Sequence, residues 1–207
     1  MPNIICLLGP DGSGKTTLAR ELAKNFSAMG FKVKVSWMRG THTLASLIAR
    51  FISNFSIFRG SQNIYYGIII PKGLVKMWHF LEFVSVMPIF LIKFLFPSLL
   101  GYIVVGERGL LDFIIWVSMT TDSPNFVGSF LGRATLAIAL KYSFNIYIKA
   151  DLIVLASRKR DSSKTLRLQL SLYDPLAKSL GIFTVDTTNK TPKNSLTEIL
   201  YNIACRT

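Results

Sequence analysis

Acidic residues are scarce in this sequence, and their scarcity is the first constraint on its partners. Eleven Asp and Glu residues stand against 24 Lys and Arg among 207 residues, so the formal net charge at pH 7 is +13. No acidic residue lies between Glu21 and Glu82. A field of this sign leaves nucleotide phosphates, nucleic acid and an anionic membrane surface open as partners. A generally basic surface of scattered, solvated charges is the simpler interpretation.

Cysteine is scarce too. The two cysteines are Cys6, in an apolar run, and Cys205, near the C-terminus, and their positions exclude a disulfide framework and a cysteine-based metal site. No basic stretch precedes the first apolar run, so we expect no secretory signal and a cytoplasmic location. No repeat, linker or low-complexity tract divides the chain, and we therefore expect one domain over residues 1–207.

Long hydrophobic runs without charge are missing as well. Residues 74–100 are very apolar, but Lys76, Glu82 and Lys93 interrupt them, so no window of 18 residues is free of charge. A transmembrane helix needs about 20 consecutive, predominantly apolar residues. We therefore expect a buried or dimer-forming helical segment here, with contact to a membrane surface and a true span as the alternatives.

Glycine is concentrated where the first strand gives way to the first helix. Residues 3–8 predict a buried strand, and residues 18–24 predict a helix with Leu18 and Leu22 on one face. The sequence between them has the spacing G-x-x-x-x-G-K-T of a phosphate-binding P-loop. It consists of Gly9, Pro10, Asp11, Gly12, Ser13, Gly14, Lys15, Thr16 and Thr17.

These residue types suit phosphate chemistry. Glycine permits a backbone that turns consecutive N–H groups toward an anion at a helix N-terminus. Lys15 is expected to bind the β- and γ-phosphates and the Thr16 hydroxyl to ligate Mg²⁺, so ATP and Mg²⁺ are the expected cofactors. Phosphoryl transfer needs no covalent nucleophile, so the lack of a Ser-His-Asp or Cys-His constellation is no obstacle.

Four further runs predict strands that alternate with helices. The strands cover residues 32–37, 101–106, 152–156 and 182–185. The helices cover residues 44–55, 110–119, 126–142, 166–180 and 192–203. The expected fold class is therefore α/β, a P-loop NTPase fold with a five-stranded parallel sheet in the order 2-3-1-4-5 and helices on both faces.

An acidic and a basic residue follow the strand at 101–106 directly. They are Glu107 and Arg108, at the edge of the sheet where a P-loop kinase needs an acid and a cation. Glu107 is expected to hold Mg²⁺ through water or to orient the acceptor oxygen. Arg108 is expected to clamp a phosphate.

The only dense basic cluster lies around residues 157–165, after the expected strand at 152–156. We interpret it as a lid-like segment that closes Arg158 and Arg160 over the phosphates, with a solvated loop as an equal alternative.

With these residues in place, the sequence resembles the thymidylate kinase group of P-loop nucleoside monophosphate kinases. Residues 9–17 are close to that family's phosphate loop, and Glu107-Arg108 stands where the family has Asp-Arg. The basic cluster and the sequence at 185–188 are weaker matches. The resemblance implies Mg²⁺-dependent transfer of a phosphoryl group from ATP to a nucleoside monophosphate, dTMP in this family.

Two departures concern the acceptor. The family's loop after its second strand reads Arg-Glu-Pro-Gly, whereas Arg39 here is followed directly by Gly40. The family's base-reading helix carries Phe and Arg, whereas the corresponding region here offers Trp78, His79 and Phe80. Arg39, Trp78 and Arg108 are the expected substrate contacts.

Two alternative functions stay open. The Glu-Arg pair also resembles the motif of deoxyribonucleoside kinases. Aromatic residues interleave the basic interval between Lys24 and Lys76, which is compatible with a P-loop ATPase or polynucleotide kinase that binds nucleic acid or a membrane surface.

The apolar excess leads to an expected homodimer. Half of the residues are hydrophobic, and the mean hydropathy is +0.41. One sheet cannot cover both 74–100 and 126–142, and thymidylate kinases, which the chain resembles, commonly pair through helices that flank the sheet. We therefore expect an interface drawn from residues 74–96 and 126–140 that buries at least about 1,200 Å².

Overall fold

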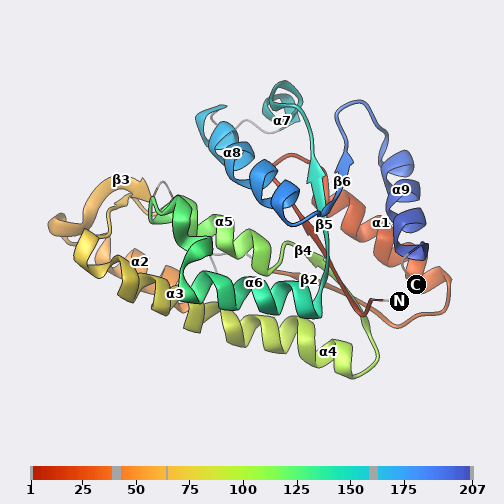
Figure 1. Cartoon of the computed structure of the whole chain (residues 1–207), viewed down its shortest axis with the longest axis horizontal. Coiled ribbons are helices and arrows are strands. Elements are labelled where there is room, and N and C mark those ends of the chain that lie inside the picture. Colours follow the sequence, from red (N-terminus) through yellow and green to blue (C-terminus); the bar gives the residue numbers. More distant parts are fainter. Residues whose placement is uncertain (1, 39–42, 64, 159–162, 206–207) are drawn as a thin grey trace.

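The computed structural model describes residues 2–38, 43–63, 65–158 and 163–205. Its centre is a parallel five-stranded sheet with the strand order β2-β4-β1-β5-β6 (Figure 1). The strands are β1 (Ile4–Leu8), β2 (Val33–Trp37), β4 (Ile103–Glu107), β5 (Phe144–Lys149) and β6 (Phe183–Asp186). Counted along the chain, these five strands have the order 2-3-1-4-5. The α/β P-loop NTPase fold expected from the sequence is confirmed.

Strand β1 lies in the middle of the sheet and is buried on both faces. Cys6 of β1 is paired with Gly106 of β4 on one side and with Asn145 of β5 on the other. The side chains of Ile4, Cys6 and Leu8 join one hydrophobic core, and those of Ile5 and Leu7 join a second. A parallel sheet covered on both faces needs such a continuous apolar strand.

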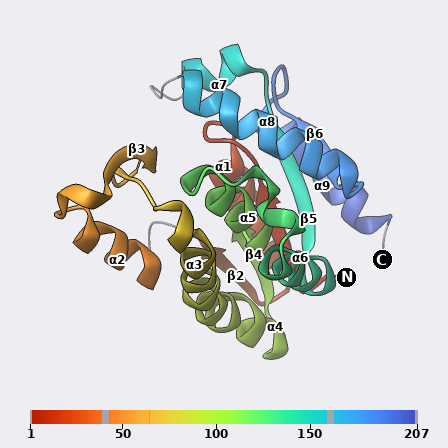
Figure 2. The ribbon, with the colours of Figure 1, turned by 60° about the vertical axis from the view of Figure 1, so that its left-hand side comes forward.

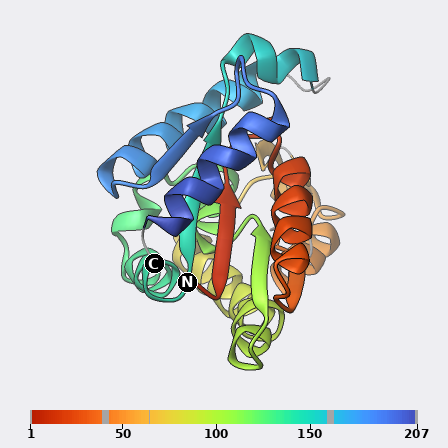
Figure 3. The same cartoon turned by 90° about the vertical axis from the view of Figure 1, so that its right-hand side faces the viewer.

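Helices cover each face of the sheet (Figure 3). The core that contains Ile5 is closed by α1 (Lys15–Ala28) and α9 (Pro192–Ala204). The core that contains Cys6 is closed by α3 (Val75–Phe90), α5 (Leu110–Thr120), α6 (Phe130–Tyr142) and α8 (Ser163–Ser179). Helix α5 is apolar on nearly every side because it lies between the sheet and the outer helices.

The expected strand at 152–156 is wrong. These residues form α7 (Leu152–Arg158), and the strand beside β1 is β5. A short apolar run has the same appearance in a buried strand and in a short helix, so the pattern alone does not separate them. In α7 only one side packs, with Leu155 buried against α8 and Ile153 83% exposed.

The segment at 74–100 is helical, as expected. Helix α3 continues through a π-helical turn at Leu91–Leu95 into α4 (Phe96–Leu99). Pro88 lies inside α3, just before the π-helical turn. Proline lacks an N–H donor and its ring crowds the preceding turn, and π-helical turns mark local changes of helix geometry. Phe94 is fully buried, and its ring packs closely on Gly106 of β4. A Cβ on that glycine would lie only 2.7 Å from the ring.

A small unit extends beyond the sheet at the N-terminal end of α3 (Figure 2). It contains α2 (Leu44–Ile52) and β3 (Arg59–Asn63), which is not part of the five-stranded sheet and forms antiparallel bridges with Ile68. A separate apolar cluster joins α2, the segment after β3, and α3 through Trp78. This unit therefore has a small core of its own.

Candidate functional site: a nucleotide cleft and an adjoining cavity

The loop between β1 and α1 has a backbone that requires its glycines. Gly9, Gly12 and Gly14 have φ angles of 143°, 85° and 93°. A Cβ at Gly9 would lie 2.1 Å from the carbonyl oxygen of Ile148 in β5. No larger residue fits there, and the left-handed backbone at Gly12 and Gly14 favours glycine. The loop leads into the N-terminus of α1, where the helix dipole favours an anion.

Lys15 begins α1, and its ammonium group folds back over the loop. Its Nζ donates hydrogen bonds to the carbonyl oxygen of Pro10 at 2.6 Å and to Ser13 Oγ at 3.2 Å. Burial, followed by the positive charge of Arg108, lowers the pKa of Lys15 to about 7. A phosphate would supply the opposite charge that this ammonium group needs.

Thr16 and Glu107 meet at the edge of the sheet. The Thr16 hydroxyl donates a hydrogen bond to Glu107 Oε1 at 2.6 Å. Pairing of β1 with β4 places Glu107 opposite Leu7, at the carboxyl end of the strand beside the loop. Mg²⁺ prefers oxygen ligands and is commonly bound by one or two protein groups together with substrate phosphates. A hydroxyl and a carboxylate in contact fit such an ion.

No group of three or more His, Cys, Asp and Glu side chains forms a metal site within the described ranges. A protein-only metal centre is therefore not found in that part of the chain. The Thr16–Glu107 pair instead fits an ion that the nucleotide brings with it.

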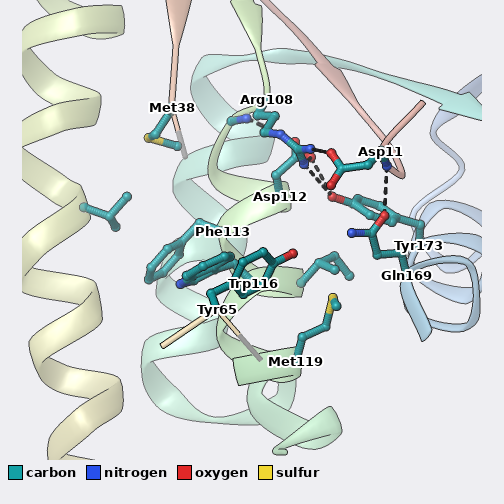
Figure 4. A pocket seen from close by; sticks show the side chains of 13 residues that line it. Asp11, Met38, Tyr65, Arg108, Asp112, Phe113, Trp116, Met119, Gln169 and Tyr173 are labelled. Atoms are coloured by element: carbon teal, nitrogen blue, oxygen red, sulfur yellow. Dashed lines mark hydrogen bonds and ion pairs between the residues drawn. The ribbon is translucent and has the colours of Figure 1, made fainter. Parts of the chain in front are cut away.

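Arg108 is the centre of a buried polar network (Figure 4). One end of its guanidinium group, Nη2, forms an ion pair with Asp11 Oδ1. The other end, Nη1, donates to Asp112 Oδ1 at 3.2 Å and to the Tyr173 hydroxyl at 3.4 Å. Tyr173 in turn donates to Asp112 Oδ1 at 2.6 Å, and the Asp11 N–H donates to Gln169 Oε1 at 2.8 Å. One arginine thus connects the P-loop with α5 and α8.

The backbone of Arg108 is left-handed, with a φ angle of 72°. Successive side chains of an extended strand point to opposite faces. The left-handed turn allows both Glu107 and Arg108 to contact the P-loop, through Thr16 and Asp11. Asp112 supports this turn, because its Oδ2 accepts a hydrogen bond from the Gly109 N–H at 3.1 Å.

The charges of the network depend on burial and on pairing. Burial alone would lower the pKa of Arg108, but Tyr173, Asp112 and Asp11 raise it above its usual value. Burial raises the pKa of Asp112, although Arg108 and Lys15 oppose this rise. The guanidinium group is therefore held in its charged form beside the phosphate loop.

Arg158, at the end of α7, contacts the loop at a different residue from Arg108. Its Nη1 donates to Thr187 Oγ1 at 3.2 Å and to the Gly12 carbonyl oxygen at 3.5 Å, and its Nη2 donates to the Thr187 carbonyl oxygen at 2.9 Å. Thr187, in the loop after β6, also donates to the Ser13 carbonyl oxygen at 3.1 Å. The structure thus places Arg158 over the P-loop, on a helix and not on the expected loop after a strand. Arg160 lies outside the described residues.

Two cavities share Asp11 and Arg108. The first is a cleft of about 420 Å³ over the P-loop, which Lys15, Thr16, Thr17, Glu107, Arg158 and Thr187 also line. The second is a smaller cavity of about 30 Å³ whose wall is mainly apolar and aromatic. It is lined by Met38, Tyr65, Val86, Phe113, Trp116, Met119, Gln169 and Tyr173, among others.

The expected substrate contacts are only partly brought together. Arg108 lines both cavities, and Arg39 lies outside the described residues. Trp78 lines neither cavity, because it packs in the separate cluster with Ala45 and Ile68. The tryptophan of the second cavity is Trp116, on α5, and its ring lies 4.6 Å from that of Tyr65, centroid to centroid.

Sequence reasoning missed the partners of Arg108. Asp112 follows it by four residues at the start of a helix, a spacing that could have indicated the pair. Tyr173 and Gln169 carry no such signal, since they reach the site only through the packing of α8 against α5.

Comparison with known proteins supports the nucleotide-binding assignment. Residues 5–63 match the family described as "ATPase family associated with various cellular activities (AAA)". The match covers 59 of the 207 residues, from β1 through β3, and does not reach Glu107 or Arg108. No curated protein matches the chain. The match and the fold together support a P-loop NTPase that binds ATP, a class that typically uses Mg²⁺.

Proposed function

We propose that this protein transfers the γ-phosphoryl group of ATP to a nucleoside monophosphate, with dTMP as the first acceptor to test. The observation that carries the proposal is the second cavity, which meets the nucleotide cleft at Asp11 and Arg108. An ATPase needs only water as its acceptor. A phosphotransferase needs a separate, protected site beside the γ-phosphate, and the second cavity is in that position.

On the donor side, the loop backbone and Lys15 bind the β- and γ-phosphates of ATP. Thr16 and Glu107 hold Mg²⁺, which neutralises charge on the phosphates. Arg158, which donates to the Gly12 carbonyl oxygen and lines the cleft, adds positive charge. The catalytic contribution of these groups is positioning and electrostatic stabilisation.

On the acceptor side, Arg108 orients the acceptor phosphate. A guanidinium group has five N–H donors in a planar arrangement, so Arg108 can keep its carboxylate partners and still contact a phosphate oxygen. Asp11 and Asp112 fix the direction of that group. A lysine at this position could not make the same set of contacts.

The aromatic wall suits a nucleobase. Trp116 and Tyr65 present rings tilted by 37° to each other, and bases stack favourably on such surfaces. Ligand pockets usually measure about 300–1,000 Å³, whereas the second cavity measures about 30 Å³. The walls must therefore move apart when the acceptor enters, and their closure would exclude water from the transfer step.

The experiment is an ADP-release assay with ATP, Mg²⁺ and a panel of nucleoside monophosphates and nucleosides. We expect ADP release to depend on a monophosphate and to fall at least about 100-fold in Lys15→Met, because the phosphate cation is lost. The matched control is Lys24→Met, an exposed lysine of the same helix that pairs with Glu21; it should retain turnover within about twofold.

The assay separates the rival functions. Stimulation by nucleosides and not by monophosphates would favour a deoxyribonucleoside kinase. ATP hydrolysis at a rate that no acceptor changes would contradict the proposal and leave an ATPase.

A further inference from the structure

The outer side of the long α3–α4 helix is apolar along its whole length. We call its exposed apolar side chains the outer stripe, and most of them are three, four or seven residues apart, the spacings that share one side of a helix. They are Met77, Phe80, Val84, Leu91, Ile92, Phe96 and Leu99, each 44–76% exposed. A helix that is apolar on every side is normally buried in a large core or in a membrane, yet this one has water on one side.

Among the described residues, the helix Lys72–Leu99 is the one that is long and apolar enough to cross a membrane. Only 33% of its most hydrophobic window is buried inside the protein. Helix α2, which packs beside α3, adds exposed Leu47 and Phe51 to the same part of the molecule. The apolar surface is therefore larger than isolated exposed residues would produce.

Lysines stand at both ends of the outer stripe. Lys72 and Lys76 lie at its N-terminal end, and Lys93 lies near its C-terminal end. Lys32 is close to that second end, because its carbonyl oxygen accepts a hydrogen bond from the N–H of Ile103 at 2.8 Å. All four of these lysines are exposed.

Carboxylates are scarce in the part of the sequence that carries these lysines. Between Glu21 and Glu107 the sequence has a single acidic residue, Glu82. Glu82 is 2% exposed, on the inner side of α3. Among the described residues between 22 and 106, the exposed charged side chains are therefore all basic.

We propose that the outer stripe and its lysines dock on an anionic membrane surface. Apolar side chains would enter the boundary between headgroups and acyl chains while the flanking lysines contact lipid phosphates. A second copy of the chain fits this surface less well. A two-fold interface brings the same patch against itself, so the lysines of one copy would face the basic patch of the other, and residues 22–106 supply no exposed carboxylate to pair with them.

The helix lies on the membrane and does not cross it. Its inner side supplies Val86, Phe90 and Phe94 to the main hydrophobic core, each no more than 1% exposed. A spanning helix would withdraw these side chains and uncover α5 and β4. The outer stripe can enter the membrane boundary with the core left intact.

Docking can be tested separately from the proposed function, because the P-loop cleft that binds ATP is formed by other elements. The test is cosedimentation of the full chain with vesicles of phosphatidylcholine that contain 30% phosphatidylglycerol, compared with pure phosphatidylcholine. We expect binding to the anionic vesicles that weakens as salt is raised. Each lysine near such a surface contributes about fivefold to partitioning, so Lys72→Gln with Lys76→Gln should weaken binding about 25-fold.

The matched control for charge is Lys178→Gln with Lys193→Gln, two exposed lysines on α8 and α9. To test the apolar side chains of the outer stripe, Phe80→Ser with Ile92→Ser should abolish vesicle binding. Tyr201 is an exposed aromatic residue on α9, and Tyr201→Ser should leave vesicle binding unchanged. Each variant should still bind ATP, which shows that it is folded. Because vesicle binding is measured without phosphoryl transfer, its outcome does not depend on whether the kinase proposal holds.

Three results would overturn the inference. One is equal loss of binding in the control and stripe variants. Another is no vesicle binding at all. The third is a detergent-free mass of twice the chain's 23.2 kDa that Phe80→Ser with Ile92→Ser halves, which would show that the outer stripe is a dimer interface.

Discussion

The Thr16 hydroxyl donates a hydrogen bond of 2.6 Å to Glu107 Oε1, although the two residues are 91 positions apart. The contact exists because β4 is paired with β1, so that the strand before Glu107 ends beside the loop before Thr16. The sequence predicted both residues as Mg²⁺ ligands, each from its own motif. Their contact shows that one ion could be shared between them.

Replacing Glu107 by glutamine should weaken the binding of Mg²⁺. An amide oxygen can still accept the hydrogen bond from Thr16, but the negative charge that attracts the ion is lost. We expect the Mg²⁺ concentration for half-maximal ADP release to rise at least about tenfold. The control is Glu21→Gln, on the outer side of α1. If the Mg²⁺ concentration for half-maximal ADP release were unchanged in Glu107→Gln, the carboxylate of Glu107 would not hold the ion.

Nucleotide binding should take up a proton at Lys15. Burial lowers the pKa of Lys15 to about 7, so above pH 7 the free protein holds much of this side chain neutral. A bound phosphate favours the charged form and raises that pKa. Affinity for ATP should therefore fall as the pH rises above 7, by up to about tenfold per pH unit.

Calorimetry measures this linkage directly. Titrations at pH 8 in buffers of different ionisation enthalpy should give proton uptake for the wild type and none for Lys15→Met. Equal heats in all buffers for the wild type would contradict the assigned pKa. The ATP γ-phosphate also titrates near neutral pH, so the difference between the two proteins is the quantity to compare.

Glu82→Gln should stabilise the protein at pH 8. Burial raises the pKa of Glu82 from 4.5 to about 7, with the indole N–H groups of Trp116 and Trp78 opposing the rise. The folded state then binds more protons than the unfolded state between pH 4.5 and 7, so the free energy of unfolding falls as the pH rises through this range. A shift of this size corresponds to about 3 kcal/mol.

Urea unfolding of both proteins at several pH values tests the prediction. The gain from Glu82→Gln should be near zero at pH 4 and reach its full size above pH 7. A gain that does not change with pH would mean that Glu82 has the same pKa in the folded and unfolded states, and would contradict the prediction. Glu198→Gln is the control, an exposed carboxylate that pairs with Lys190.

Trp116→Leu should raise the KM for the acceptor and leave the KM for ATP unchanged. The ring contacts that of Tyr65, tilted by 37°, at the wall of the second cavity, and stacking of a base on an aromatic ring is worth about 1–3 kcal/mol. The expected change is therefore about tenfold or more. Trp78→Leu is the matched control, because that ring is buried outside both cavities; it should lower stability without changing either KM. If Trp78→Leu raised the KM for the acceptor and Trp116→Leu did not, the base would contact Trp78 and the prediction would be wrong.

The strand order and the P-loop could be predicted because each depends on local patterns. The apolar run at 3–8 and the glycine spacing after it define a strand, a loop and a helix without reference to the rest of the chain. Strand β5 was missed for a physical reason. Asn145 and Lys149 interrupt its apolar pattern, yet Asn145 is buried and satisfied by hydrogen bonds from its Nδ2 to the carbonyl oxygens of Ala139 and Ser143.

The acceptor side of the site could not be predicted in the same way. Trp78 and Trp116 both lie in apolar helices, and nothing in their neighbours shows which one faces a cavity. Their roles depend on how α3 and α5 rotate against each other when they pack. The pairing of Arg108 with Tyr173 likewise depends on α8 crossing α5, which joins residues 65 positions apart.

The π-helical turn at Leu91–Leu95 separates two halves of one long helix. Within the turn, Phe94 is fully buried against Gly106 of β4, while toward the N-terminus Val86 belongs to the wall of the second cavity. Val86 lies about 7.5 Å along the helix axis from the start of this turn, so a tilt of about 10° there would displace that wall by about 1.3 Å. The helix that carries the outer stripe therefore also supplies a wall residue of the second cavity. A force on the stripe that tilted this helix would change the width of that cavity.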